Sequence, residues 1–289
     1  ICIDEYETYL DYQQEVLNTL LKGAKPNLTY KIGVRELGWT TRTILDGNEP
    51  LISPADYVRI DLGQRWAGRE FEAFARAVAQ ARLGRYAALV AGELAPDETP
   101  EAPDVTALLP SLSASEEAKR LGAERIASTF RENLEHRPDL QEAISGIGHL
   151  EMTVLDYWRQ AQEWTYERTA EDFANNPKSW ETRYVNYSYS ALFTIRQRRT
   201  GIRKYYSGWS TFLHLAAGNI RYALELVEQS FLQSIGDATV ALPVVAAEEQ
   251  TRAAIAVGEK NLTELEQVDE FGSDLIRIVL GLGRVFQMM

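Results

Sequence analysis

The first 62 residues alternate between short apolar runs and one amphipathic stretch. An apolar run at residues 1–3 predicts a buried strand, and apolar side chains at helical spacing predict a helix over 6–22 that ends at Gly23. β-Branched and aromatic residues predict further strands at 28–34 and 57–62. This strand–helix–strand order, with connections too long for hairpins, is typical of one side of a parallel α/β sheet.

From residue 64 onward, the pattern has the helical period almost throughout. Residues 93–113 interrupt it, because they are rich in Pro, Asp and Glu and predict a flexible acidic linker. Helices are expected at roughly 66–86, 115–136, 140–174, 179–197, 209–216, 219–234, 245–266 and 272–287. The predicted fold class is therefore predominantly α, with a small α/β portion at the start.

Composition narrows the class of protein. Of the 289 residues, 45% are hydrophobic and 25% are charged, which is typical of globular chains. The formal net charge of -12 argues against coating nucleic acid through bulk attraction, although it is compatible with a local basic site. No apolar run of about 18 residues occurs, so no membrane span is expected and the cytoplasm is the default location.

Cysteine and histidine usage argues against a structural metal centre. Cys2 is the single cysteine, which excludes an internal disulfide and a cysteine metal cluster. His136, His149 and His214 lie far apart and show no ligand spacing, so a zinc site is not expected. The chain opens with Ile inside an apolar strand, and we therefore expect it to be part of a longer polypeptide.

Two carboxylates follow the first strand, at Asp4 and Glu5. In P-loop ATPases, a buried strand delivers such a pair to the sheet edge where nucleotide phosphates bind. One carboxylate then helps to hold Mg²⁺, and the other orients or deprotonates the attacking water. The alternative interpretation is a strand end followed by a helix N-terminus, at which acidic side chains favour the helix dipole.

Two arginine positions extend this candidate site. The second predicted strand carries Lys31 and exits at Arg35, and either side chain is a candidate sensor of a terminal phosphate; an ordinary strand with a solvated arginine is the alternative. In Gly218-Asn219-Ile220-Arg221, the glycine ends one helix and the asparagine starts the next. Arg221 then lies in a first helical turn, where its planar guanidinium can reach a phosphate, or it is a surface arginine of a helix–turn–helix connection.

Taken together, these segments resemble a known family. ICIDE, LTYKIGVR, YVRIDL and LAAGNIRYALEL are similar, in that order, to the Walker B strand, sensor 1 strand, following strand and sensor 2 of AAA+ ATPases. Gly-Asn-x-Arg before an aliphatic helix is most similar to the origin-recognition, or initiator, branch and its bacterial relatives. The resemblance covers about the first 65 and the last 85 residues, whereas the middle matches no motif.

The resemblance implies an architecture and a set of roles. Residues 1–63 would be the C-terminal part of a P-loop ATPase core, 64–240 a helical lid with a helical insertion near 93–200, and 241–289 the start of a winged-helix-like domain. ATP and Mg²⁺ would be the cofactors. Asp4 would coordinate Mg²⁺, Glu5 would be the catalytic carboxylate, Arg35 and Arg221 would contact nucleotide, and Arg42 would occupy the region of a trans-acting arginine finger.

Two features depart from that family. No Gly-x-x-x-x-Gly-Lys-Ser/Thr occurs in the chain, so the phosphate-cradling loop is expected upstream of Ile1 if the parent protein is an active ATPase. The separation of Arg35 and Arg221 is also long for a simple lid, which is the reason for placing an insertion between them.

Within that insertion, residues 184–206 join aromatic side chains to a basic cluster. Such a mixture can stack bases and grip phosphates. We favour an aromatic packing stripe followed by a solvated basic turn, and we likewise expect Trp158, Trp164 and Trp180 to serve in packing.

The leading hypothesis is an ATP-binding and ATP-hydrolysing switch that forms a homo-oligomer. Its output would be DNA handling through the winged-helix region, or control of an effector protein as in bacterial antiviral defence. The alternative is a non-catalytic helical module that binds DNA or protein and keeps a degenerate ATPase remnant. A helical scaffold with a purely structural role is a third, weaker hypothesis.

Overall fold

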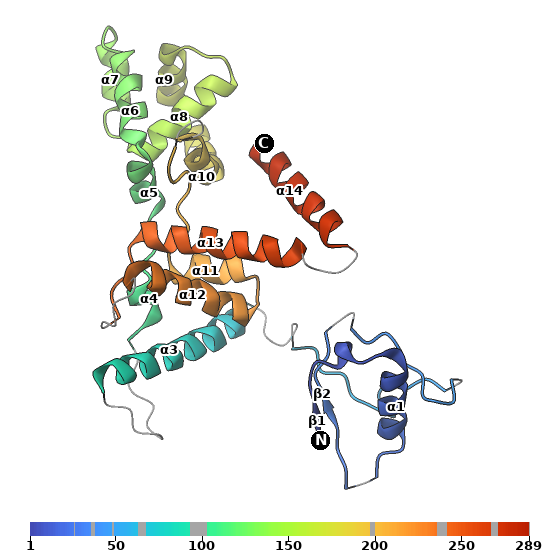
Figure 1. Ribbon diagram of the computed structural model, residues 1–289. Helices are drawn as coiled ribbons and strands as arrows, with labels where there is room; N and C mark the ends of the chain where they lie inside the picture. The colour runs from blue at the N-terminus through green and yellow to red at the C-terminus, as the bar shows by residue number, and fades with distance from the viewer. Residues whose placement is uncertain are drawn as a thin grey trace. The chain divides into compact units, whose positions relative to one another are not determined.

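The computed structural model describes residues 1–25, 27–35, 38–47, 49–62, 68–92, 103–196, 200–235, 242–266 and 271–288 (Figure 1). The chain divides into two compact units, Ile1–Trp66 and Ala67–Met289. The first contains a pair of parallel strands, and the described part of the second is helical. The prediction of a predominantly α chain is confirmed.

The first unit is built around a parallel strand pair. β1 (Cys2–Ile3) pairs with β2 (Lys31–Ile32), with Cys2 opposite Lys31 and Ile3 opposite Ile32. The connection contains the 3-10 helix η1 (Tyr6–Thr8) and α1 (Asp11–Lys22). The parallel pair is as predicted. The helix is shorter than predicted, because Tyr9 and Leu10 are extended and separate η1 from α1.

The prediction of a third strand at 57–62 is wrong for the described residues. These residues form no ladder with either described strand. Their alternating pattern is nevertheless present, because Val58, Ile60 and Leu62 are 74%, 66% and 63% exposed. A strand exists only when its backbone pairs with a neighbour, and a sequence pattern alone cannot supply that neighbour.

The centre of the first unit is polar. Gln14 and Asn18, on α1, are fully buried, and Asn18 donates hydrogen bonds to the carbonyls of Thr41 and Thr43 at 2.9 and 3.0 Å. The Tyr6 hydroxyl donates to Asn18 Oδ1 at 2.9 Å. These bonds fix the loop after β2 against α1.

Raising the pH should destabilise this unit through Tyr6. Burial raises the pKa of Tyr6 to about 12, whereas the pKa of a tyrosine in an unfolded chain is about 10. Below about pH 10 the phenol is neutral in both states, and between about 10 and 12 the unfolded chain loses its proton first. Unfolding measured from pH 9 to 12 should therefore show a steeper loss of stability for the wild type than for Tyr6→Phe. Parallel curves would contradict this.

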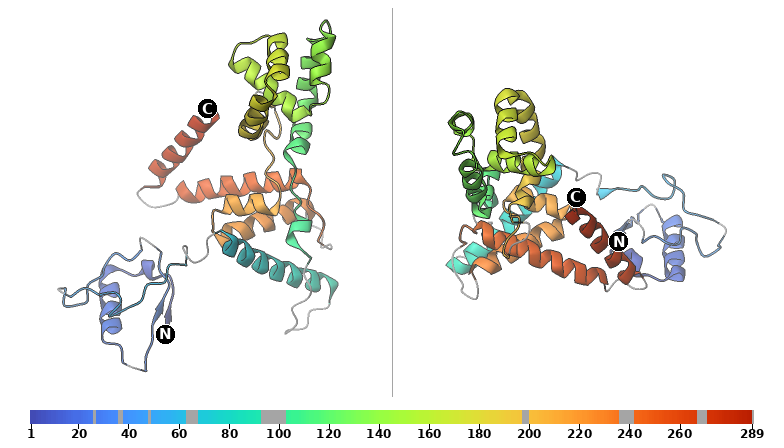
Figure 2. Two further views of the ribbon diagram at one scale, coloured as in Figure 1. Left: turned by 180° about the vertical axis from the view of Figure 1, so that it is seen from behind. Right: turned by 90° about the horizontal axis from the view of Figure 1, so that it is seen from above.

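The second unit has a helical core formed by elements far apart in sequence. α3 (Arg69–Ala91), α11 (Trp209–Ala216), α12 (Ile220–Ile235) and α13 (Ala247–Glu266) share it, and α13 lies along α12 in every view (Figures 1 and 2). The side chains buried there include those of Phe71, Trp209, Phe212, Leu226, Phe231 and Val257. α14 (Gly272–Met288) follows and contacts α13.

The predicted linker at 93–113 is partly wrong. Residues 93–102 lie outside the described residues, but α4 (Val105–Leu108) follows at once. Val105, Leu108 and Leu109 are buried in the helical core. Asp104 caps α4 by accepting from the Thr106 amide at 3.0 Å and binds Arg76 of α3 at 2.7 Å. The acidic residue that suggested a solvated linker is thus a helix cap.

Six helices form the middle of the chain, where the sequence predicted three. They are α5 (Ala114–Leu121), α6 (Ala123–Glu132), α7 (Pro138–Ile144), α8 (His149–Ala161), α9 (Tyr166–Asn175) and α10 (Pro177–Thr194). Gly122 separates α5 from α6 because its φ of 94° lies in the left-handed region. None of the described helices is long and apolar enough to span a bilayer.

A buried ion pair joins these helices to the segment before α11. Lys204 Nζ lies 2.8 and 2.7 Å from the two carboxylate oxygens of Glu117 on α5, and both side chains are 7% exposed. The Tyr205 amide donates to Glu117 at 2.8 Å. The prediction of a solvated basic turn is therefore wrong for Lys204; Trp158 and Trp180 pack edge to face, as expected.

Candidate functional site

The candidate site begins at the carboxyl ends of the two parallel strands. Asp4 directly follows β1, and Arg35 lies three residues after β2. Two backbone hydrogen bonds continue the pairing beyond the strands, from Gly33 N to Ile3 O at 2.8 Å and from Tyr6 N to Gly33 O at 3.1 Å. The pairing therefore brings an acidic and a basic side chain to one edge, as the sequence predicted.

Asp4 is held by its immediate neighbours. One of its carboxylate oxygens, Oδ1, accepts from the Glu5 amide at 2.9 Å. A Cβ added to Gly33 would lie 2.6 Å from that oxygen, so a larger residue there would displace the carboxylate from this position. Glu5 has φ 51° and ψ 44°, in the left-handed region, and its side chain is exposed. Glu5 thus follows Asp4 directly, in a backbone conformation that is uncommon for residues other than glycine.

Arg35 has a partner that the sequence analysis did not identify. Its Nε lies 3.0 Å from Glu7 Oε1, and its backbone amide donates to Glu7 Oε2 at 3.3 Å. Gly38 permits this approach, because an added Cβ would lie 2.4 Å from the Glu7 Cβ. The side chain of Arg35 is otherwise 85% exposed. Glu7 therefore positions an arginine that remains accessible to an anion.

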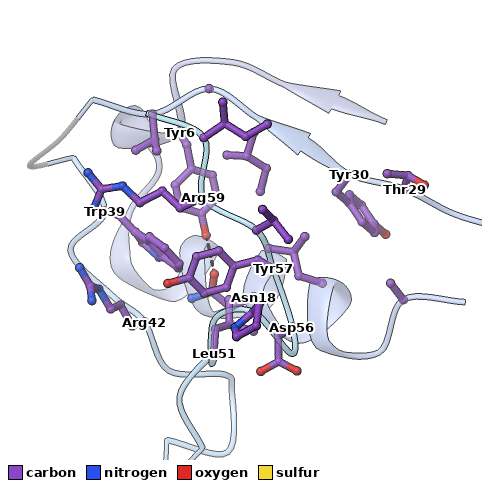
Figure 3. Close-up of a pocket in the computed structure, with 18 of the residues that line it drawn as sticks. Tyr6, Asn18, Thr29, Tyr30, Trp39, Arg42, Leu51, Asp56, Tyr57 and Arg59 are labelled. Atoms are coloured by element: carbon purple, nitrogen blue, oxygen red, sulfur yellow. Dashed lines mark hydrogen bonds between the residues drawn. The ribbon is translucent and has the colours of Figure 1, made fainter. Parts of the chain in front are cut away.

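Arg42 belongs to an aromatic group in the same unit (Figure 3). Its guanidinium lies 5.3 Å from the ring centre of Trp39, which meets Tyr57 edge to face at 5.0 Å. Its carbonyl accepts from the Leu51 amide at 2.9 Å. Asn18 holds the carbonyls of Thr41 and Thr43 on either side. These hydrogen bonds hold the loop that carries Arg42. Arg42 and Arg35 both line a cavity of about 930 Å³.

Arg221 lies in the second unit, near the start of α12. Ala217 and Gly218 both have positive φ and end α11, and Asn219 Oδ1 then accepts from the Arg221 amide at 2.9 Å. This confirms the predicted turn between the two helices. The side chain is 71% exposed, and its guanidinium lies 3.8 Å from Glu264 of α13, which is a weak surface contact.

The donor atoms at the strand edge fit Mg²⁺ better than a tightly caged metal. Among the described residues, no group of three or more His, Cys, Asp or Glu side chains could hold a metal ion. Mg²⁺ is commonly bound through one or two carboxylates together with substrate phosphates and water. Asp4, with its accessible carboxylate, is suited to that arrangement.

Comparison with known proteins identifies the family. The ORC-CDC6-like family profile matches residues 1–289, so the chain belongs to the ORC-CDC6-like family. No curated protein and no solved structure matches it. Membership makes the chain a relative of initiator-type AAA+ proteins, which as a class are nucleotide-binding ATPases. The match also spans the middle of the chain, which no sequence motif had covered.

Proposed function

We propose that this chain is the Mg²⁺- and lid-bearing part of an ATP-hydrolysing switch. The observation that carries the proposal is the placement of Asp4 and Arg35 after the carboxyl ends of two paired parallel strands, in a chain of the ORC-CDC6-like family. A carboxylate can bind the Mg²⁺ of a magnesium–triphosphate, and a guanidinium can bind its phosphate oxygens.

Each proposed residue has a separate task. Asp4 holds Mg²⁺, which would neutralise charge on the phosphates when bound. Glu5 accepts a proton from the attacking water or orients it. Arg35 and Arg221 bind phosphate oxygens, and Arg42 is the candidate for completing a neighbouring subunit's site. Sensing of the terminal phosphate by Arg221 would couple the nucleotide to the helical unit.

The output of the switch is proposed from the family and not from the site. Initiator-type relatives make a homo-oligomer the expected assembly. DNA handling through a winged-helix-like end at 241–289 is one output, and control of an effector protein in antiviral defence is the other. Action in the cytoplasm suits both.

The test is ATP binding and turnover by the full-length protein, with and without Mg²⁺. Magnesium-dependent turnover is expected. If no nucleotide binds, the proposal fails and the helical interaction module takes its place. It predicts partner binding independent of ATP and, for DNA, an affinity that falls with salt.

Replacing Arg221 by alanine should lower turnover by about 10- to 100-fold, the loss of one charge-assisted hydrogen bond. Folding should barely change, because the side chain is 71% exposed and its contact with Glu264 is long. The measurement is steady-state ATP turnover beside thermal unfolding. Arg252→Ala, at an exposed position of α13, is the matched control. Normal turnover in Arg221→Ala would remove its proposed role.

A further inference from the structure

The middle helices carry a groove with apolar walls that the proposed nucleotide site does not use. It lies between α8 and α10, which pack against each other (Figure 1), and its volume is about 230 Å³. Val154, Leu155 and Trp180 are its most deeply buried lining residues, at 1%, 0% and 3% exposure. Phe173 and Tyr184 also line it and are partly exposed. The groove is therefore an apolar opening in the surface of the helical unit.

Hydrogen bonds and ring contacts hold one wall of the groove in place. Trp180 Nε1 donates to Asp172 Oδ2 at 3.0 Å, and the Arg183 guanidinium donates to the same oxygen at 2.9 Å. That guanidinium lies 4.5 Å from the ring centre of Trp180, and Phe173 meets the Trp180 ring edge to face at 6.1 Å. Because Trp180 is already fixed, little side-chain freedom is lost there when a partner binds.

Two carboxylates border the groove without a cation. Glu151 on α8 and Glu181 on α10 both line it, and none of its described lining residues is a lysine or an arginine. Glu151 Oε2 accepts from the Gly148 amide at 2.6 Å, but neither glutamate forms an ion pair with a described residue. Asp156 on α8 and Asp172 on α9, in contrast, each bind an arginine at 2.9 Å. The rim of the groove therefore has a negative charge that complements a cationic partner.

The size of the groove limits what it accepts. Sites for cofactors and other small ligands usually have volumes of about 300–1,000 Å³. This groove is smaller, at about 230 Å³, so one large apolar side chain suits it better than a nucleotide does. A lysine or arginine beside that side chain would then lie at the acidic rim. A polypeptide segment supplies both groups a few residues apart.

We propose that this groove binds an exposed segment of another protein, through one large apolar side chain that has a lysine or an arginine beside it. The apolar side chain is buried against Trp180, and the cation pairs with Glu151 or Glu181. The helices α5 to α10 then serve as a docking module of the chain. The proposal uses none of the residues assigned to nucleotide, so it does not depend on the proposed function.

Selection from random peptides displayed on phage tests the proposal with a defined probe. Peptides enriched on the purified protein should share a leucine, phenylalanine or tryptophan with a lysine or arginine a few positions away. A synthetic peptide of the most enriched sequence should bind Glu181→Lys at least about 10-fold more weakly than the wild type, because like charges repel. Fluorescence anisotropy of the labelled peptide measures this affinity. Thermal unfolding should not change, because Glu181 is exposed and has no ion pair with a described residue.

Glu132→Lys is the matched control, because it makes the same change at an exposed position of α6 outside the groove. It should bind the peptide as tightly as the wild type does. If no such peptide is enriched, or if Glu181→Lys binds it as tightly as the wild type, the proposal is overturned.

Changes in the peptide separate the two halves of the interaction. Alanine in place of the large apolar residue should weaken binding by about 10-fold or more. Glutamine in place of the lysine or arginine should weaken it by about 3-fold or more and remove most of its salt dependence. If alanine has no effect, the protein offers only an acidic surface and the proposal is overturned. Self-association of the wild type that Glu181→Lys abolishes would assign the groove to a second copy, which also overturns it. Absence of ATP turnover with peptide binding intact would count against the proposed function alone.

Discussion

Glu5→Gln is expected to lower ATP turnover of the full-length protein by about 10²- to 10⁴-fold while ATP binding is retained. Glutamine has the size of glutamate but cannot accept a proton from water. The Glu5 side chain is exposed and makes no hydrogen bond or ion pair with the described residues, so the fold should not change. Turnover and equilibrium ATP binding, measured on the same preparation, check the result.

Glu15→Gln is the matched control, because it removes one carboxylate from α1 of the same unit. It should hydrolyse ATP at the wild-type rate. Unchanged turnover in Glu5→Gln would show that another group activates the water. Loss of ATP binding would instead assign Glu5 to nucleotide or Mg²⁺ binding, a role proposed for Asp4.

The helical half of the fold was predictable because periodicity and helix ends coincide in it. The helix predicted at 209–216 is α11 residue for residue, since Gly208 precedes it and Ala217 and Gly218 end it with positive φ. The predicted helix at 115–136 instead breaks at Gly122. A single glycine within an apolar period does not reveal whether its φ is positive, and that angle decides whether one helix or two result.

The first unit was harder to predict, because its structure depends on buried polar side chains and on the pairing of strands. Val16 and Leu20 belong to the apolar spacing that predicted the helix, but they are 39% and 50% exposed, while Gln14 and Asn18 are buried. These amides bind loop carbonyls from distant residues, which no local pattern encodes. The segment at 57–62 has the predicted alternation, but it pairs with no strand among the described residues.

The candidate site was predictable as far as it depends on strand order. Asp4 and Arg35 follow successive strands, and parallel pairing brings them to one edge. Glu7 was not predicted, because its role depends on the close approach that Gly38 allows. Nor did the sequence indicate that Gly33 leaves space for the Asp4 carboxylate. Both glycines act through absent side chains, so their function is visible only in three dimensions.

Glu117→Ala is expected to destabilise the second unit by about 3–5 kcal/mol, because it leaves the Lys204 ammonium buried without its counter-charge. Lys204 also donates to the Tyr205 carbonyl at 3.0 Å and lies near the rings of Tyr189 and Tyr206, but neutral groups do not replace a carboxylate. Urea unfolding followed by tryptophan fluorescence measures the loss. Glu124→Ala is the control: its pair with Lys119 is exposed and 3.9 Å long, so a change below about 0.5 kcal/mol is expected.

The double variant Glu117→Leu/Lys204→Met separates the charge from the packing. Removing both charges ends the electrostatic penalty, and buried ion pairs replaced by apolar side chains are often as stable as before. Here the Tyr205 amide also loses its acceptor at Glu117 Oε1, which costs about 1–3 kcal/mol. The double variant should therefore lie between the wild type and Glu117→Ala. If the double variant is as unstable as Glu117→Ala, the loss of stability comes mainly from the unpaired Tyr205 amide and not from the charge of Lys204.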